Sequence, residues 1–105
     1  MNSSEYHVHS YCIRTNCSNG HIHFMNGITG PPVFTGPSHV HYYEGTTSFD
    51  YGHVHCYGCC TGPSIPCPGG GHIHCMNGCT TFDRCHSHSY GAPTGREESS
   101  RLFKK

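Results

Sequence analysis

All twelve histidines of this chain occur in pairs separated by a single residue. The six pairs are His7-Val8-His9, His21-Ile22-His23, His39-Val40-His41, His53-Val54-His55, His72-Ile73-His74 and His86-Ser87-His88. The first histidines of successive pairs are 14, 18, 14, 19 and 14 residues apart, so a short step alternates with a longer one. A fixed period of this length is typical of repeat proteins. The spacing therefore predicts three tandem repeats of 32 or 33 residues in one repeat domain, residues 7–95 (7–38, 39–71 and 72–95).

Short segments flank this predicted repeat domain. Residues 1–6 form an N-terminal arm, and residues 96–105 form a C-terminal tail in which six of ten residues are charged. Two descriptions of the tail stay open at this point. One is a single helical turn around Leu102 and Phe103, and the other is a solvated end without fixed structure.

The spacing within each pair predicts strands. Side chains at i and i+2 of a strand point to the same face, about 6.6–7 Å apart. In a helix they would point roughly 200° apart. Five of the six middle residues are Val or Ile, which favour strands. Dipeptides such as Asn19-Gly20, Asn26-Gly27 and Asn77-Gly78 suit tight turns. We therefore expect an all-β fold of many short strands.

Two arrangements of the repeats fit the period. Around a pseudo-threefold axis, equivalent histidines would form rings of three. In a stacked solenoid, the same residues would form ladders about 4.8 Å apart. The four columns are His7, His39 and His72; His9, His41 and His74; His21, His53 and His86; and His23, His55 and His88. The sequence does not decide between rings and ladders.

The composition leaves little material for an aliphatic core. Ile, Leu, Val and Phe together number 15 of 105 residues, whereas His and Cys together number 21. Two ways of stabilising the interior remain. Histidine rings could pack and hydrogen-bond with Tyr and Thr, or bound metal ions could supply folding free energy.

Imidazole and thiolate are both ligands for transition metals, and six cysteines lie close to a histidine pair. We expect Zn or Cu ions, with Ni as a further candidate, and release of the metal as pH falls through about 6.5, the ordinary pKa of histidine. The predicted ligands are His7, His9, His21, His23, His39, His41, His53, His55, Cys56, Cys59, Cys60, His72, His74, Cys75, Cys79, Cys85, His86 and His88.

Several functional classes are disfavoured. The formal net charge is zero, which argues against a nucleic-acid partner. No apolar run approaches a membrane span, and no secretory signal is visible, so we expect no membrane partner, reduced thiols and a cytoplasmic location. The repeats carry only Glu44, Asp50 and Asp83 as acidic groups, and the metal-ligand motifs of cupins and metallo-β-lactamases are absent. We therefore expect no enzymatic activity.

The sequence is consistent with a non-enzymatic metal-binding protein that serves in storage, buffering or metal-stapled scaffolding. The alternative is a self-assembling structural subunit of a coat or fibre, in a cell or spore surface layer. Such a subunit would use exposed strand edges and Cys crosslinks. In either case we expect a homo-oligomer or polymer.

With the repeats laid out, the chain resembles the bacterial YmaF-like family over roughly residues 7–95. The matching features are His-x-His followed by Gly-x-Thr, the bridge from Thr61-Gly62-Pro63 through Gly71 to His72, and the segment from Thr47 to His55. The family occurs in spore-forming bacteria and has no assigned activity, so the resemblance implies the repeat register and no function. This chain departs from the pattern in its many cysteines, and in Arg14 to Ser18, where the first repeat lacks Thr-Ser-Phe-Asp.

Overall fold

A computed structural model describes residues 6–99, and within this range every regular element is a β-strand. The all-β prediction is confirmed. No helix in the described part of the chain is long and apolar enough to cross a membrane. The strands are β1 (His7–Arg14), β2 (Phe24–Ile28), β3 (Pro32–Phe34), β4 (His39–Thr46), β5 (Cys56–Cys60), β6 (Ile65–Pro66), β7 (His72–Ile73), β8 (Cys75–Cys79), β9 (Ser89–Pro93) and β10 (Glu97–Ser99).

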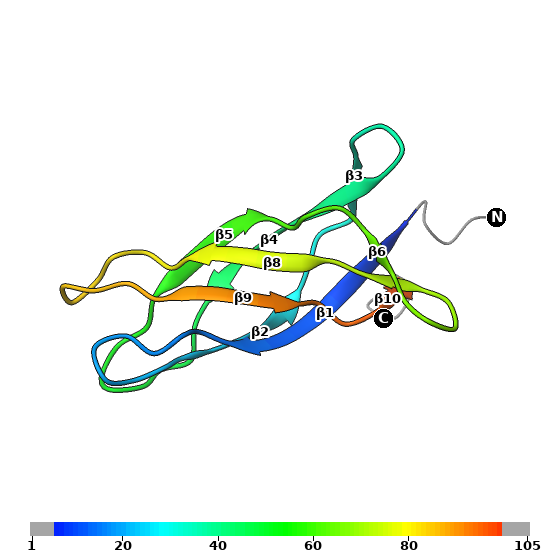
Figure 1. Ribbon diagram of the computed structural model, residues 1–105. Helices are drawn as coiled ribbons and strands as arrows, with labels where there is room; N and C mark the ends of the chain where they lie inside the picture. Colours follow the sequence, from blue (N-terminus) through cyan, green and yellow to red (C-terminus); the bar gives the residue numbers. More distant parts are fainter. Residues whose placement is uncertain (1–5, 100–105) are drawn as a thin grey trace.

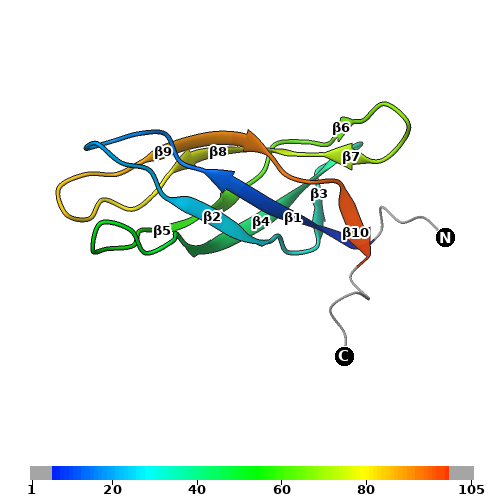
Figure 2. The same ribbon diagram turned by 90° about the horizontal axis from the view of Figure 1, so that it is seen from below.

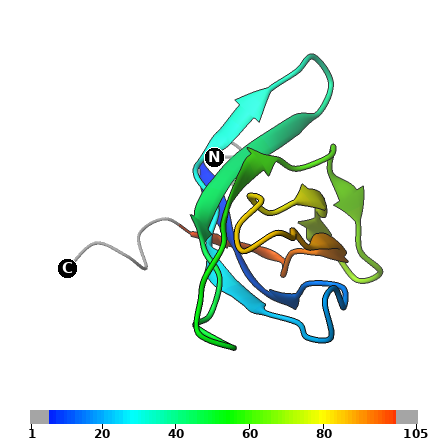
Figure 3. The same cartoon turned by 90° about the vertical axis from the view of Figure 1, so that its left-hand side faces the viewer.

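Three antiparallel hairpins run along the long direction of the molecule: β1-β2, β4-β5 and β8-β9 (Figures 1 and 2). The molecule measures 48 × 31 × 24 Å. Strand β2 contacts β4, β5 contacts β8, and β9 contacts β1. The end view in Figure 3 shows the three hairpins around one interior. No strand pairing continues from one of these hairpins to the next, and only single backbone hydrogen bonds join them, so the sheets stay separate and form no closed barrel.

A short strand follows the first two hairpins and pairs with the start of the next histidine strand. Strand β3 pairs with β4, and β6 pairs with β7. After the third hairpin, β10 pairs with β1 at the start of the chain, with Glu97 opposite His9. The first residues of the predicted C-terminal tail are therefore part of a sheet. The helical turn considered around Leu102 and Phe103 lies outside the described residues.

The same backbone hydrogen bond occurs three times, at positions about 32 residues apart. The N–H of Gly30 donates to the carbonyl of Tyr42 (2.8 Å), that of Gly62 to Cys75 (3.0 Å), and that of Gly95 to Ser10 (2.9 Å). The third bond joins the end of the domain to its beginning. A contact between the last and first segments is what a ring of repeats would require, whereas in a stack of coils the last unit would not touch the first.

Each hairpin ends in a two-residue turn with positive φ at both positions, as a type I′ turn requires. The turn residues are Asn19-Gly20, Tyr51-Gly52 and Arg84-Cys85. The predicted turn at Asn19-Gly20 is therefore confirmed. The predictions at Asn26-Gly27 and Asn77-Gly78 are wrong, since both dipeptides lie inside strands. A Cβ atom at Gly27 would come within 2.5 Å of the Tyr11 hydroxyl, so this glycine makes room for a neighbouring side chain.

Tyrosine and methionine fill the interior between the histidines. They stand two residues after the second histidine of each pair, at the next inward position of the strand. The hydroxyls of Tyr11 and Tyr57 are 3.0 Å apart, and those of Tyr43 and Tyr90 are 2.8 Å apart. The six inward residues are Tyr11, Met25, Tyr43, Tyr57, Met76 and Tyr90. This aromatic layer replaces the aliphatic core that the composition lacks.

Candidate metal centres

The twelve histidines gather into two groups on opposite sides of the tyrosine layer. The pairs that begin at His7 and His39 lie in β1 and β4, and the pair that begins at His72 starts in β7. The pairs that begin at His21, His53 and His86 precede β2, β5 and β9 and form only isolated bridges, so the prediction that every pair lies in a strand is wrong for these three. Cluster 1 comprises His7, His9, His39, His41, His72 and His74. Cluster 2 comprises His21, His23, His53, His55, His86 and His88. Both clusters contain side chains from all three hairpins or from the strands that lead into them.

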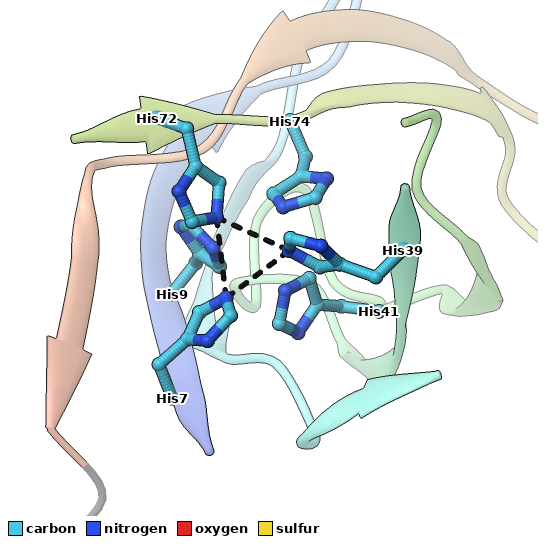
Figure 4. Close-up of side chains that lie close together, drawn as sticks. All are labelled: His7, His9, His39, His41, His72 and His74. Carbon is cyan, nitrogen blue, oxygen red and sulfur yellow. Dashed lines mark hydrogen bonds between the residues drawn. The ribbon is translucent and has the colours of Figure 1, made fainter. Parts of the chain in front are cut away.

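Cluster 1 consists of two rings of three imidazoles (Figure 4). In the first ring, the Nε2 atoms of His7, His39 and His72 form a triangle whose three sides are each 3.2 Å. In the second ring, the centroids of His9, His41 and His74 are 4.5–4.6 Å apart. One ring nitrogen from each of the six side chains lies within 4.8 Å of all the others.

Backbone carbonyls fix the orientation of the second ring. The Nδ1 atoms of His9, His41 and His74 each lie 2.9 Å from a glycine carbonyl oxygen, those of Gly95, Gly30 and Gly62 respectively. A carbonyl oxygen only accepts, so each Nδ1 carries the proton and donates it. The remaining nitrogen, Nε2, therefore has an unprotonated lone pair directed into the cluster. Within residues 6–99, these three buried Nε2 atoms have no hydrogen-bond partner.

Six threonines hold the histidine backbone in place. The N–H of the second histidine in every pair donates to a buried threonine Oγ1 at 3.0–3.2 Å. The threonines are Thr15, Thr29, Thr47, Thr61, Thr80 and Thr94. Their role was not predicted from the sequence, although the signal is present: a threonine stands six residues after the second histidine of every pair.

Cluster 2 has the same construction with slightly different contacts. The Nε2 atoms of His23 and His53 are 3.2 Å apart, and those of His55 and His86 are 3.3 Å apart. All six Nδ1 atoms lie 3.0–3.3 Å from a backbone carbonyl oxygen. The carbonyl acceptors belong to Asn19, Ser48, Tyr51, Thr81, Arg84 and Asn16. All six Nε2 atoms in this cluster are consequently lone-pair acceptors.

Hydrogen bonds cannot explain all of these short Nε2–Nε2 distances at once. A neutral imidazole has one N–H, and in cluster 2 the carbonyls take it. In cluster 1, a single nitrogen cannot donate and accept at once, so the triangle of His7, His39 and His72 cannot close as three hydrogen bonds. Lone pairs that face each other at 3.2 Å repel unless a cation lies between them. A metal ion is a cation that all of these nitrogens can share.

Protons are poor candidates for that cation near neutral pH. Burial, together with repulsion from neighbouring histidines, lowers the pKa of His9 and of His39 to about 4 and that of His41 to about 3. Burial likewise lowers the pKa of His23, His74 and His88. At pH 7 these imidazoles are neutral, which is the form that binds metals.

Three carboxylates approach the clusters from outside. Glu97 lies 3.4 Å from Nδ1 of His72, Asp83 lies 3.3 Å from Nδ1 of His55, and Asp50 lies 3.6 Å from Nδ1 of His23. Asp50 and Asp83 also accept hydrogen bonds from the hydroxyls of Ser48 and Thr81 at the hairpin ends. Carboxylates behind ligand imidazoles are a frequent feature of metal sites, where they orient the ring and raise its basicity.

The structure brings together all twelve predicted histidine ligands but none of the predicted cysteines. No cysteine belongs to the groups of potential ligands among residues 6–99. Cys56, Cys75 and Cys85 adjoin a histidine in sequence, and adjacent strand residues point to opposite faces. All nine cysteines are free, and Cys12, Cys17, Cys56, Cys59, Cys60, Cys79 and Cys85 are exposed. Metal binding by Cys56, Cys59, Cys60, Cys75, Cys79 or Cys85 stays a prediction, and it concerns sites outside the two clusters.

The fold and these clusters define a class: a small all-β protein whose interior contains two groups of buried histidines that could hold metal ions. Within that class, the chain belongs to the YmaF family, described as spore germination protein GerY/YamF, whose model matches residues 4–95. This match confirms the resemblance noted in the sequence. Searches of curated proteins and of solved structures find no match.

Proposed function

We propose that this protein is a non-enzymatic metal-binding protein with one transition-metal site in each histidine cluster. The observation that carries the proposal is the inward orientation of unprotonated Nε2 atoms. In cluster 1, the Nδ1–H of His9, His41 and His74 is held by carbonyls, so the Nε2 lone pairs have only the cluster centre to face. Without a cation, these buried acceptors would go unsatisfied at a substantial free-energy cost.

The arrangement favours metal-stapled scaffolding over rapid buffering or storage. Each cluster draws ligands from strands of all three repeats, so a bound ion links segments far apart in the chain. Eleven of the twelve ligands are buried, among them the fully enclosed His9 and His41, and His72 is of intermediate burial with 14% of its side chain exposed. Binding an ion to the folded form alone would add directly to the free energy of unfolding. The family description makes the spore the setting in which we propose that this protein acts.

The burial of the histidine ligands also supports the proposal that this protein is not an enzyme. Catalytic metal sites keep a coordination position open for water or substrate, whereas structural sites are closed by protein ligands. Six imidazoles around one centre fill the positions of an ion, and the second ring of cluster 1 is inaccessible to solvent.

Elemental analysis of the full chain, purified without added metal, tests the proposal. A free-thiol count is made on the same sample. We expect about two tightly held ions per chain, one per cluster. We also expect thiols that react before any chelator is added, since most of them are exposed and lie outside the clusters. If the folded protein contains no metal and binds no added transition-metal ion, the proposal is wrong, and the histidines of the clusters only pack against one another.

A second candidate function rests on the exposed thiols. Seven of the nine cysteines are exposed and unpaired. Oxidation between molecules would join them into a coat or fibre, as proposed for a structural subunit. Gel filtration under reducing and oxidising conditions separates the two functions. A small species of fixed size under both conditions supports metal binding alone, whereas large disulfide-linked assemblies under oxidising conditions support the structural role.

A further inference from the structure

The number and positions of the imidazoles carry information about which ion is bound. We infer that each cluster is an octahedral site with six imidazole ligands, and that it selects Ni²⁺, Co²⁺ or Fe²⁺ over Zn²⁺ and Cu⁺. This inference rests on the proposed function. It departs from the zinc or copper expected from the sequence, because that expectation included thiolate ligands and counted four ligands per site.

The geometry of cluster 1 fits an octahedron. In its first ring, three Nε2 atoms form an equilateral triangle with 3.2 Å sides, which matches one triangular face of an octahedron. The second ring, formed by His9, His41 and His74 with ring centroids 4.5–4.6 Å apart, would supply the opposite face (Figure 4). An octahedron with these edges has opposite corners about 4.5 Å apart and a centre about 2.3 Å from each corner. All six nitrogens do lie within 4.8 Å of one another.

Lower coordination would leave nitrogens unsatisfied. A tetrahedral ion would use four of the six imidazoles. The other two lone pairs would stay buried beside a cation without binding it, since the Nδ1–H of the second ring is committed to carbonyls of Gly95, Gly30 and Gly62. The Nε2 atoms of His9, His41 and His74 are also closed to water. Six-coordination is the arrangement that uses every lone pair.

The electronic preferences of the ions then decide selectivity. Zn²⁺ has a filled d shell, gains nothing from an octahedral field and is usually tetrahedral in structural sites. Cu⁺ prefers soft sulfur ligands, and none of the grouped side chains supplies sulfur. Ni²⁺, Co²⁺ and Fe²⁺ accept imidazole and are stabilised by six nitrogen ligands. Cluster 2 also contains six imidazoles, but they form two overlapping sets of four, so six-coordination there requires the two sets to move together around one ion. The expected capacity is two ions per chain.

Cobalt spectroscopy on the wild-type chain tests the coordination number. The full chain is stripped with a chelator, checked for β structure and titrated with Co²⁺. We expect a weak visible absorption that saturates at two ions, because octahedral Co²⁺ absorbs roughly tenfold less than tetrahedral Co²⁺. An intense blue tetrahedral spectrum would overturn the inference while leaving metal binding intact. If Co²⁺, Ni²⁺ and Zn²⁺ all fail to bind, the proposed function fails as well.

A competition and a pair of variants test the selectivity and the role of the second ring. With equal Ni²⁺ and Zn²⁺, we expect bound Ni²⁺ to exceed Zn²⁺; an excess of Zn²⁺ would contradict the inference.

His41→Ala should lower the Ni²⁺ affinity of one site about tenfold or more, by removing one of six ligands. Tyr42→Phe is the matched control, because the neighbouring Tyr42 side chain is 48% exposed and lies outside the clusters. Unchanged Ni²⁺ binding in a folded His41→Ala protein would place that ring outside the coordination shell. The wild-type cobalt spectrum decides the coordination number even if the variant does not fold.

Discussion

At the scale of single residues, the third hairpin turn differs from the other two in a way that affects stability. Gly20 and Gly52 occupy the second turn position of the first two hairpins with φ of 84° and 80°, whereas Cys85 occupies it with φ of 67°. A side chain with a Cβ is unfavourable in this left-handed region by about 1 kcal/mol or more. Cys85 is exposed and belongs to neither cluster.

We therefore predict that Cys85→Gly raises the free energy of unfolding by about 1 kcal/mol without changing metal content. Denaturant titration and elemental analysis measure the two effects. Gly52→Ala is the reverse control: its added Cβ meets nothing within 4 Å, so only the backbone conformation can cause the expected loss. If Cys85→Gly loses metal, the thiol is a ligand and the distinction drawn between cysteines and clusters is wrong.

The buried histidines also predict how the metal-free chain responds to pH. Burial lowers the pKa of His9 and His39 to about 4, below the 6.5 of an unfolded histidine. Between these values the unfolded chain binds more protons than the folded one, so stability decreases as pH falls from about 6.5 toward about 4 and is level above 6.5. Metal release, expected from the sequence near pH 6.5, should accordingly move to lower pH.

Denaturation of the chelator-treated chain at pH 7.5 and pH 5.0 measures this effect. We expect lower stability at pH 5.0. The lowered pKa values of Asp83 and Glu97 keep those carboxylates ionised at both pH values, so they do not account for the change. Equal stability at the two pH values would mean that the imidazoles are not desolvated as the structure describes.

At the scale of strands and hairpins, the threonines connect the paired strands to the histidine rings. Thr61 Oγ1 accepts the backbone N–H of His41 at 3.1 Å and donates to the carbonyl of Gly62 at 2.9 Å. That same carbonyl accepts the Nδ1–H of His74. The Thr61 hydroxyl therefore helps to position two ligands of cluster 1, His41 and His74.

We predict that Thr61→Val, which keeps the shape and removes the hydroxyl, costs about 1–3 kcal/mol of stability and lowers metal affinity about 10- to 100-fold. Calorimetric titration with Ni²⁺ and denaturant unfolding give the two values. The control is Thr35→Val at an exposed position of the loop between β3 and β4, where neither value should change appreciably. An unaltered affinity in Thr61→Val would show that the outer hydrogen bonds do not orient the imidazoles.

The sequence correctly predicts strands for the histidine pairs of β1, β4 and β7. It wrongly predicts strands for the pairs that begin at His21, His53 and His86, and it does not predict the hydrogen-bond partners that surround the sites. His-x-His with a β-branched middle residue fixes which face of a strand is polar, so the inward histidines follow from local alternation. The same alternation argues against Cys56 and Cys75 as cluster ligands, because a residue next to a histidine in a strand points to the opposite face. Their position beside a histidine in the sequence therefore does not indicate a shared metal site. Local sequence alternation cannot predict that the carbonyls of Gly95 and Gly62 accept hydrogen bonds from His9 and His74, because only the folded chain brings these residues together.

At the scale of the whole molecule, two ions would connect the same three hairpins at opposite ends of one interior. The clusters are not equivalent. In cluster 1 all six ring nitrogens lie within 4.8 Å of one another, whereas cluster 2 divides into two overlapping sets of four that share His23 and His86. The Nε2 atoms of His21 and His88 have no hydrogen-bond partner within residues 6–99. An ion in cluster 2 must draw its ligands closer together, so we expect weaker binding there.

We predict stepwise loading, with cluster 1 filled first. In a titration of the metal-free chain with Ni²⁺, the first equivalent should bind more tightly than the second. His53→Ala, which removes a cluster 2 ligand, should weaken only the weaker step about tenfold or more, whereas the matched change His39→Ala should weaken only the tighter one. Each occupied site adds about 2.7 kcal/mol of stability when free metal is 100 times its dissociation constant. That corresponds to a rise in the thermal midpoint of at least about 10 °C for a domain of this size. A single-site variant should keep the increase that its intact site supplies, and this remainder should be larger in His53→Ala than in His39→Ala because cluster 1 binds more tightly. Two indistinguishable steps, or loss of both sites in His53→Ala, would instead mean that the clusters are coupled through the tyrosine layer between them.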